Sequence, residues 1–269
     1  MLVLINSPTA RIWSTWSKSG KRKLAQCLET ANHIAVRDEQ VAEFAHQLVP
    51  SAKVKVVPDV AFCARKFVSS PNNHRYKIKK DKGPIATLII MPEWTEIPSF
   101  LDCLNFFVSE CHKAGWTLLF LPFSPLYKHH VACRQLAEHY ATKCQTITES
   151  GYFDAQTTLD ILSQCDAVIS HSYHAVLVSF ALGIPPVALD VSFMRSKGPR
   201  TKLLSLCSSL GHDEAYTCPW IIHNKSMLWD AFVSVTSRGV NTKKVNRAID
   251  KVEAHFNSMA SIITGTIGP

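Results

Sequence analysis

The sequence has no uninterrupted apolar run long enough to cross a membrane. The best candidate, residues 176–189, is broken by Gly183, Pro185 and Pro186 and falls short of the roughly 20 apolar residues that a spanning helix needs. The N-terminus reads MLVLINSPTARIW, without a basic leader region or a small-residue cleavage site, so we interpret it as a strand and not as a signal peptide. We therefore predict no transmembrane helix and a cytoplasmic protein.

Closely spaced cysteines are also missing. The nine cysteines are scattered without a CxxC pair, which argues against a zinc site and against a small disulfide scaffold. Their odd number and their positions, mostly within expected helices and strands, indicate reduced structural thiols. The sequence likewise has no GxGxxG motif, no P-loop and no clustered metal ligands, so neither a metal nor a cofactor is expected.

The charge balance is basic, with 29 Lys and Arg residues against 21 Asp and Glu residues and a net charge of +8. Such a charge suits a polyanion, an anionic membrane surface or an anionic substrate, and does not choose among them. The basic residues concentrate at 18–23, 75–82 and 243–251, without the interleaved aromatic residues of a single-strand platform and without a zinc-finger or RNP-like motif. We therefore expect a solvated basic surface and no nucleic-acid partner.

The sequence does contain two series of alternating strands and helices. In the first series we predict strands at 2–6, 33–36 and 54–57, with helices at 20–31 and 38–48. In the second we predict strands at 86–91, 116–121, 146–147, 167–170 and 185–189, with helices at 100–113, 128–142, 155–165, 176–182, 201–210, 227–235 and 242–260. This alternation predicts right-handed crossovers and parallel sheets covered on both faces.

A polar, basic stretch at residues 69–83 separates the two series and is the predicted linker. The predicted fold class is α/β, with two Rossmann-like domains whose parallel sheets are flanked by helices. The first domain spans residues 1–68, and the second spans residues 84–269 and ends with a closing helix. Three strands and two helices would leave an edge or a face of the first sheet uncovered, so we expect an incomplete N-terminal domain.

Residues 167–190, AVISHSYHAVLVSFALGIPPVALD, give the strongest indication of a ligand site. A buried strand runs into a polar segment and then into an apolar helix that ends at Gly183. Ligands of open α/β sheets lie at the carboxyl ends of strands, where helix N-termini attract anions. His174 would lie there, although a histidine after a strand is often a capping or packing residue. We expect His171 to be structural and Ser172 to cap the helix.

Two separated segments resemble the polysaccharide pyruvyl transferase family. The first is AVRDEQVAEFAHQL followed by KVKVVPDVAF, which is similar to the family's strand ending in an Arg-Asp pair, a helix, and a strand ending in Pro-Asp. Arg37, Asp38, Pro58 and Asp59 stand at those positions. Taken without the resemblance, Asp38 is favourable in the first turn of a helix, and Arg37 can begin that helix or shape a cleft.

The second segment runs from LFLPFS through DAQTTLDILSQCD to AVISHSYHAVLVSFALGIPPVALD. It resembles the family's strand, its Leu/Tyr-His turn and its Gly-x-Pro ending, with Tyr173, His174, Gly183 and Pro185 in the matching positions. The sequence departs from the family pattern at two arginines. Ser172 stands where the family commonly has arginine in the turn, and the strand LIIMPEW ends without the second arginine.

The resemblance implies a two-domain protein of the GT-B type that transfers a pyruvyl (carboxyethylidene) group from phosphoenolpyruvate to a sugar of a surface polysaccharide or its precursor. The implied partners are phosphoenolpyruvate and a saccharide acceptor, and a lipid-linked acceptor would bring peripheral membrane contact. His174 is the implied catalytic residue. The candidate substrate-binding residues, some of which are equally well read as solvated charges or caps, are Arg37, Ser172, Tyr173, Lys197, Arg200 and Lys202.

Two alternatives remain open from the sequence. The departures at the arginines and the short first domain suggest a noncatalytic remnant that binds a saccharide or a partner. A GT-B glycosyltransferase that uses a nucleotide-sugar is the other alternative. That enzyme would need a base-and-ribose pocket, often with a carboxylate near the cleft, and the sequence does not assign Glu149, Asp190 or Asp213 to such a pocket.

Overall fold

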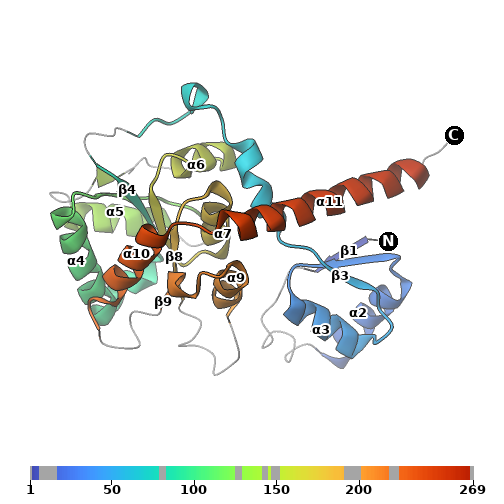
Figure 1. Ribbon diagram of the computed structural model, residues 1–269. Coiled ribbons are helices and arrows are strands. Elements are labelled where there is room, and N and C mark those ends of the chain that lie inside the picture. The colour runs from blue at the N-terminus through green and yellow to red at the C-terminus, as the bar shows by residue number, and fades with distance from the viewer. Residues whose placement is uncertain are drawn as a thin grey trace. The chain divides into compact units, whose positions relative to one another are not determined.

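The computed structural model describes residues 2–5, 17–78, 83–124, 129–140, 145–146, 152–190, 201–217 and 224–266. The chain forms two compact units. Unit 1 comprises Met1–Cys63 and Asn246–Pro269, and unit 2 comprises Ala64–Val245. Each unit contains one sheet with helices packed on it (Figure 1), and the strand pairs of both sheets are parallel. The predicted α/β fold with parallel sheets flanked by helices is therefore confirmed.

Unit 1 is built on a three-stranded sheet in the order β1-β2-β3. Its elements are β1 (Leu2–Ile5), α2 (Lys18–Thr30), β2 (His33–Val36), α3 (Glu39–Leu48) and β3 (Val54–Val56). Amphipathic helices α2 and α3 close over the strands because their apolar residues recur at helical spacing. The buried core residues of this cluster are Leu28, Ile34, Val36, Val41, Ala42, Ala45, Val49 and Ala52.

The last helix, α11 (Thr242–Thr266), belongs to unit 1 from Asn246 onward, whereas the sequence assigned it to the second domain. Val252 is fully buried and His255 is 8% exposed. His255 lies close enough to Lys55 of β3 and His33 of β2 for their charges to act on its imidazole. A three-stranded parallel sheet with two helices needs further apolar cover. This need explains why α11 groups with unit 1.

The buried imidazole of His255 predicts that unit 1 loses stability in acid. Burial lowers the pKa of His255 below its ordinary value of 6.5, and the positive charges of Lys55 and His33 lower this pKa further. The unfolded chain therefore takes up the proton first, and stability falls as the pH drops from about 6.5 toward the lowered native pKa. Calorimetric unfolding at about pH 7.5 and about pH 5.5 checks this. We expect the unfolding temperature of unit 1 to fall less between the two pH values in His255→Leu than in the unmodified chain. An equal fall in both proteins would contradict this prediction.

Unit 2 contains a six-stranded parallel sheet in the order β6-β5-β4-β7-β8-β9. Its strands are β4 (Ile85–Ile89), β5 (Thr117–Phe120), β6 (Gln145–Thr146), β7 (Ala167–Ser170), β8 (Pro186–Leu189) and β9 (Tyr216–Thr217). The central strands β4, β7 and β8 are buried along their whole length. This burial fits a parallel sheet covered on both faces, where strands read as continuous apolar runs.

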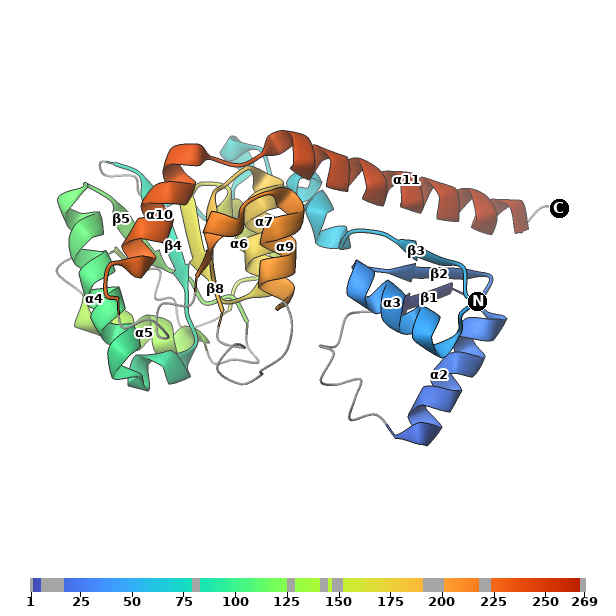
Figure 2. The ribbon, with the colours of Figure 1, turned by 60° about the horizontal axis from the view of Figure 1, so that its bottom comes forward.

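Helices cover both faces of this sheet. They are α4 (Pro98–Lys113), α5 (His129–His139), α6 (Ala155–Leu162), α7 (Tyr173–Leu182), α9 (Lys202–Leu210) and α10 (Met227–Arg238). Helices α4, α5 and α10 lie on one face, and α6, α7 and α9 lie on the other (Figure 2). Of the helices that the structure describes, none combines the length and the apolar character that crossing a bilayer demands.

The predicted linker at 69–83 is bound to unit 2 over its described part. The backbone N–H groups of Ser69 and Arg75 donate to the two oxygens of Asp160, at 3.0 and 3.4 Å. Gln164 accepts from Ile78 N at 3.0 Å and donates to a backbone carbonyl of the same segment. Burial alone would raise the pKa of Asp160, but these donors together lower it. A buried carboxylate needs such donors, so the stretch folds onto α6 instead of linking two domains loosely.

Candidate active site

The strand order of unit 2 creates a topological switch point between β4 and β7. From β4 the chain proceeds outward through β5 to β6, and from β7 it proceeds the other way through β8 to β9. The two strands end in register, with Ile89 opposite Ser170. In open α/β sheets the ligand lies in the crevice outside the carboxyl ends of the strands at such a point. We therefore expect a ligand site at the segment that follows β7.

His171, the first residue after β7, connects the two strands. Its Nδ1 lies 3.0 Å from Ile89 O, and because a carbonyl only accepts, Nδ1 carries a proton. The ring lies edge-on to Trp94, with the centroids 5.1 Å apart. Burial lowers the pKa of His171, although the Ile89 carbonyl and Glu93 act in the opposite sense. The imidazole is therefore neutral near neutral pH, and it does not replace the guanidinium that the family commonly has nearby.

The polar segment after β7 becomes the first turn of α7. The sequence placed a break at residues 171–174, whereas the helix starts at Tyr173, so Tyr173 and His174 both lie in its first turn. Ser172 occupies the cap position as predicted, but its side chain accepts no helix N–H, and the capping interpretation is wrong in that respect. Its own N–H donates to Ser170 Oγ at 2.9 Å. The helix N-terminus keeps its positive potential for another acceptor.

His174 is exposed, and its ring lies edge-on to the Tyr173 ring with the centroids 5.5 Å apart. The remainder of α7 is apolar and buried from Ala175 to Ala181, and the helix ends at Gly183 with φ 79°. This left-handed conformation favours glycine because it has no Cβ. The buried helix thus fixes the backbone of its first turn at the edge of the sheet and leaves the imidazole accessible.

The neighbouring strand β8 ends in a buried carboxylate. Asp190 is 3% exposed and accepts from Tyr216 Oη at 3.0 Å. The next helix, α9, begins at Lys202, where Thr201 Oγ1 caps the N–H of Leu204 at 3.2 Å. Because a helix that follows a strand starts at the carboxyl edge of the sheet, the half-buried Lys202 lies on the same edge as α7's first turn. Lys197, Arg200 and the candidate carboxylate Glu149 lie outside the described residues.

Unit 1 holds the other segment that resembles the family. Arg37 follows β2, Asp59 lies three residues after β3, and Arg37 Nη1 contacts Asp59 Oδ2 at 3.2 Å. Both side chains are less than 10% exposed. Asp38 accepts from Val41 N at 3.0 Å and so caps α3, which confirms its structural interpretation. The Arg-Asp and Pro-Asp motifs are thus joined by a buried ion pair.

A third histidine near the carboxyl edge of the unit 2 sheet was passed over in the sequence analysis. His130, in the first turn of α5, is hydrogen-bonded through Nδ1 to the hydroxyl of Tyr152. The sequence did not single out this pair, because the two residues lie 22 positions apart, in α5 and in the loop before α6. Asp154 caps α6 by accepting from Thr157 N at 2.7 Å. Within the part of the chain that the structure describes, no three potential metal ligands come together.

The family model of polysaccharide pyruvyl transferase matches residues 12–192, about two thirds of the chain. The chain belongs to the polysaccharide pyruvyl transferase family. The match contains both the Arg37–Asp59 pair and the first turn of α7, so the resemblance seen in the two segments is confirmed. No curated protein matches the sequence.

The fold of this chain was also compared with solved structures. A putative UDP-N-acetylglucosamine 2-epimerase from Listeria monocytogenes has a TM-score of 0.56 at 13% identity, over 92% of this chain and 65% of its own. An alpha,alpha-trehalose-phosphate synthase (UDP-forming) from Burkholderia vietnamiensis has a TM-score of 0.51 at 9% identity, over 94% and 62%. The chain thus spans less than two thirds of each protein. At such identities the likeness shows the GT-B type of fold alone.

Proposed function

We propose that this chain transfers a pyruvyl group from phosphoenolpyruvate to two hydroxyls of a sugar in a surface polysaccharide or its precursor. The observation that carries the proposal is the family match over residues 12–192, which includes the histidine turn at the switch point of the unit 2 sheet. The site lies at the carboxyl edge of that sheet. Lysine and histidine side chains there suit an anionic donor.

The chemistry sets what the site must supply. A proton adds to the methylene carbon of the enol phosphate, one sugar hydroxyl bonds to the central carbon, phosphate departs, and a second hydroxyl closes the ketal. The two hydroxyls release two protons, of which one ends in the new methyl group and one on phosphate. The reaction therefore needs a proton donor near the methylene carbon, a proton acceptor near the hydroxyls, and positive potential at the phosphate.

His174 is assigned as the proton donor or as a donor to the departing phosphate. It is exposed in the first turn of α7, where the backbone N–H groups and the helix dipole attract an anion. Ser172 and Tyr173 lie beside it and are assigned to binding the substrate. The Ser172 hydroxyl is not engaged in capping, so it is available to a substrate oxygen.

Positive charge for the donor comes in this proposal from the edge beyond β8. Lys202 lies at the start of α9, where its ammonium adds to the potential of a second helix N-terminus. Lys197 and Arg200 in the preceding loop are assigned the same role. Arg37 is assigned to a substrate contact from unit 1, with a smaller contribution because Asp59 already balances its charge at 3.2 Å.

A noncatalytic saccharide-binding protein is the second candidate function. The observation that favours it is Ser172 in the place of the family's arginine, together with a neutral His171 beside it. A donor with both a carboxylate and a phosphate is ordinarily held by guanidinium forks, and each such contact contributes about 1.5 to 3 kcal/mol. The third candidate, a GT-B glycosyltransferase, has support only from the fold.

One reaction panel separates the three candidates. The purified chain is incubated with saccharide acceptors and either phosphoenolpyruvate or nucleotide-sugars. Phosphate release coupled to an acceptor that gains one carboxyethylidene group supports the proposal. Glycosyl transfer supports the glycosyltransferase. Saccharide binding without turnover by a folded protein supports the binding protein. The cytoplasmic location and the membrane contact through a lipid-linked acceptor remain parts of this proposal.

A further inference from the structure

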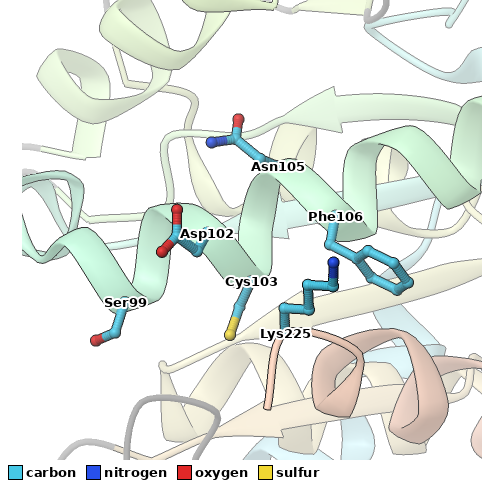
Figure 3. A pocket seen from close by; sticks show the side chains of 6 residues that line it. All are labelled: Ser99, Asp102, Cys103, Asn105, Phe106 and Lys225. Carbon is cyan, nitrogen blue, oxygen red and sulfur yellow. The ribbon is translucent and has the colours of Figure 1, made fainter. Parts of the chain in front are cut away.

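A pocket of about 500 Å³ lies in unit 2 between α4 and the segment that precedes α10. Its lining residues are Ser99, Asp102, Cys103, Asn105, Phe106 and Lys225. Figure 3 shows Ser99 and Asp102 toward one end of the pocket, Phe106 and Lys225 toward the other, and Cys103 between them. Helices α4 and α10 both follow strands, so their first turns belong to the carboxyl edge of the sheet. The lining residues belong to α4 and to the segment before α10, and these two helices lie on the face opposite the one that carries α7 (Figure 2).

Helix α4 carries two stripes of side chains with different surroundings. One stripe, which includes Phe100, Leu104 and Phe107, is fully buried in the core. The second, which contains Ser99, Asp102 and Phe106, follows the same helical spacing but lines the pocket. The Phe106 side chain is half-buried, so part of the ring is accessible beside Lys225. The second stripe is therefore not part of the hydrophobic core.

The far wall of the pocket is held in place by several contacts. The Lys225 ammonium lies 5.5 Å from the centre of the Phe106 ring. Ser226 is hydrogen-bonded to Asn224 Oδ1 and to Asp230 Oδ2, and Cys103 Sγ donates to Asn224 O at 3.6 Å. Phe107 of α4 packs edge-on against Phe232 of α10, with the centroids 5.1 Å apart. The pocket is thus shaped before a ligand arrives, which lowers the entropy cost of binding.

The polar groups of the pocket have capacity for a ligand. Among the described residues, Ser99 and Asp102 have no hydrogen-bond partner in the protein. Asn105 Oδ1 accepts from Tyr140 Oη at 2.8 Å, so its amide N–H groups point elsewhere and can donate. Cys103 is not a nucleophile here, because burial and the charge of Asp102 raise its pKa. The pocket therefore offers a hydroxyl, a carboxylate and an amide beside an aromatic ring.

We propose that this pocket binds a neutral sugar unit of the saccharide acceptor, separate from the unit that reacts at α7. The charges of Asp102 and Lys225 cancel, which disfavours a phosphate or a nucleotide and favours a polyol. An aromatic face beside hydroxyl-binding groups matches a sugar ring, which has an apolar C–H face and a polar rim. Because the pocket and α7 lie on opposite faces of one sheet, a chain of sugars is needed to reach both. The choice of ligand rests on the proposed function.

Binding is tested directly, without turnover, by saturation-transfer NMR and titration with neutral oligosaccharides: cellopentaose, mannopentaose and galactopentaose. Phe106→Leu keeps apolar volume but removes the flat ring, and Asp102→Asn keeps the shape but removes the charge. Each is expected to weaken binding about tenfold. Lys113→Gln, on the same helix but outside the pocket, is expected to bind as the unmodified chain does. Unfolding curves of each variant check that the fold is intact.

Several outcomes overturn the inference. One is unchanged binding by folded Phe106→Leu and Asp102→Asn, and another is that the unmodified chain binds none of the three probes. Displacement of a bound pentasaccharide by phosphoenolpyruvate in the chain and equally in His174→Ala would place an anion in this pocket and also overturn it. A chain that binds pentasaccharides here but transfers no pyruvyl group leaves the inference standing and removes the proposed function, so the two failures are distinguishable.

Discussion

Replacing His174 with alanine is expected to lower the rate of pyruvyl transfer by at least about a hundredfold, the typical loss on removing a general acid. The imidazole is exposed at the first turn of α7, beside the crevice where the ligand of such a sheet lies. Because buried residues of the same helix hold the backbone in place, the substitution removes the proton donor without disturbing the core. The measurement is kcat/KM for phosphate release from phosphoenolpyruvate with a saccharide acceptor.

A second substitution separates the two roles assigned to His174. In His174→Gln the amide still donates a hydrogen bond but transfers no proton near neutral pH. If His174 acts as the general acid, this variant is as inactive as His174→Ala. If it only binds phosphate, much of the rate returns. His112→Ala, an exposed histidine at the far end of α4, is the matched control. Near-normal turnover by folded His174→Ala would remove this residue from the mechanism.

The sheets could be predicted from the sequence because their strands are short apolar runs with clear ends. The predicted strands at 33–36 and 167–170 coincide with β2 and β7, and most other boundaries differ by one or two residues. Strand β9, of two residues, was not predicted, because Tyr216 and Thr217 are too few for a periodic pattern. The start of α7 was placed late because polar residues in a first turn resemble a loop.

The segment at 69–78 shows what the sequence alone does not reveal. Gln156 and Asp160 on α6 and Gln164 just after this helix are spaced four residues apart, and a polar stripe of this kind ordinarily faces solvent. Here Asp160 is fully buried, and the stripe binds the backbone of the preceding polar stretch. The partners are backbone N–H groups some 85 to 91 residues earlier, and backbone groups carry no sequence signature. The sequence identified the stretch at 69–83 as polar, but it did not predict that this stretch pairs with α6.

Some residues of the candidate site could be predicted from the sequence, and others became evident only from the fold. The family motif led from the sequence to His174, whose position at a helix N-terminus the structure then describes. His171 was interpreted as structural, and its contacts with Ile89 O and Trp94 depend on strands that are adjacent only in the folded sheet. The pocket on α4 was missed because its residues share a helix face with polar and apolar members mixed. Lys225, from more than 100 residues away, completes it.

Replacing Asp59 with asparagine is expected to destabilise unit 1 by about 3 kcal/mol, the low end of the cost of breaking a buried ion pair. The substitution removes the carboxylate 3.2 Å from the buried Arg37 guanidinium, while the Asp38 carboxylate at 3.9 Å from Arg37 Nε stays in place. It also takes away a full charge while preserving the bond that Asp59 Oδ1 can accept from Ala61 N. Hydrogen exchange of peptides from β2 and β3 reports the free energy of local unfolding, since the two units can unfold separately.

The double variant Arg37→Met with Asp59→Leu decides whether the pair acts through stability or through the substrate. Apolar residues of similar size often restore the stability lost when one partner of a buried ion pair is removed. We therefore expect exchange in β2 and β3 close to that of the unmodified chain. The exposed pair of Arg75 with Asp154 is the matched control, and Asp154→Asn there should leave protection in β2 and β3 unchanged, because solvent screens a surface pair. Equal protection in Asp59→Asn and the unmodified chain would mean that the buried contact adds little to unit 1. If the double variant is stable but transfers pyruvate poorly, Arg37 contacts the substrate, because stability has then been separated from the reaction.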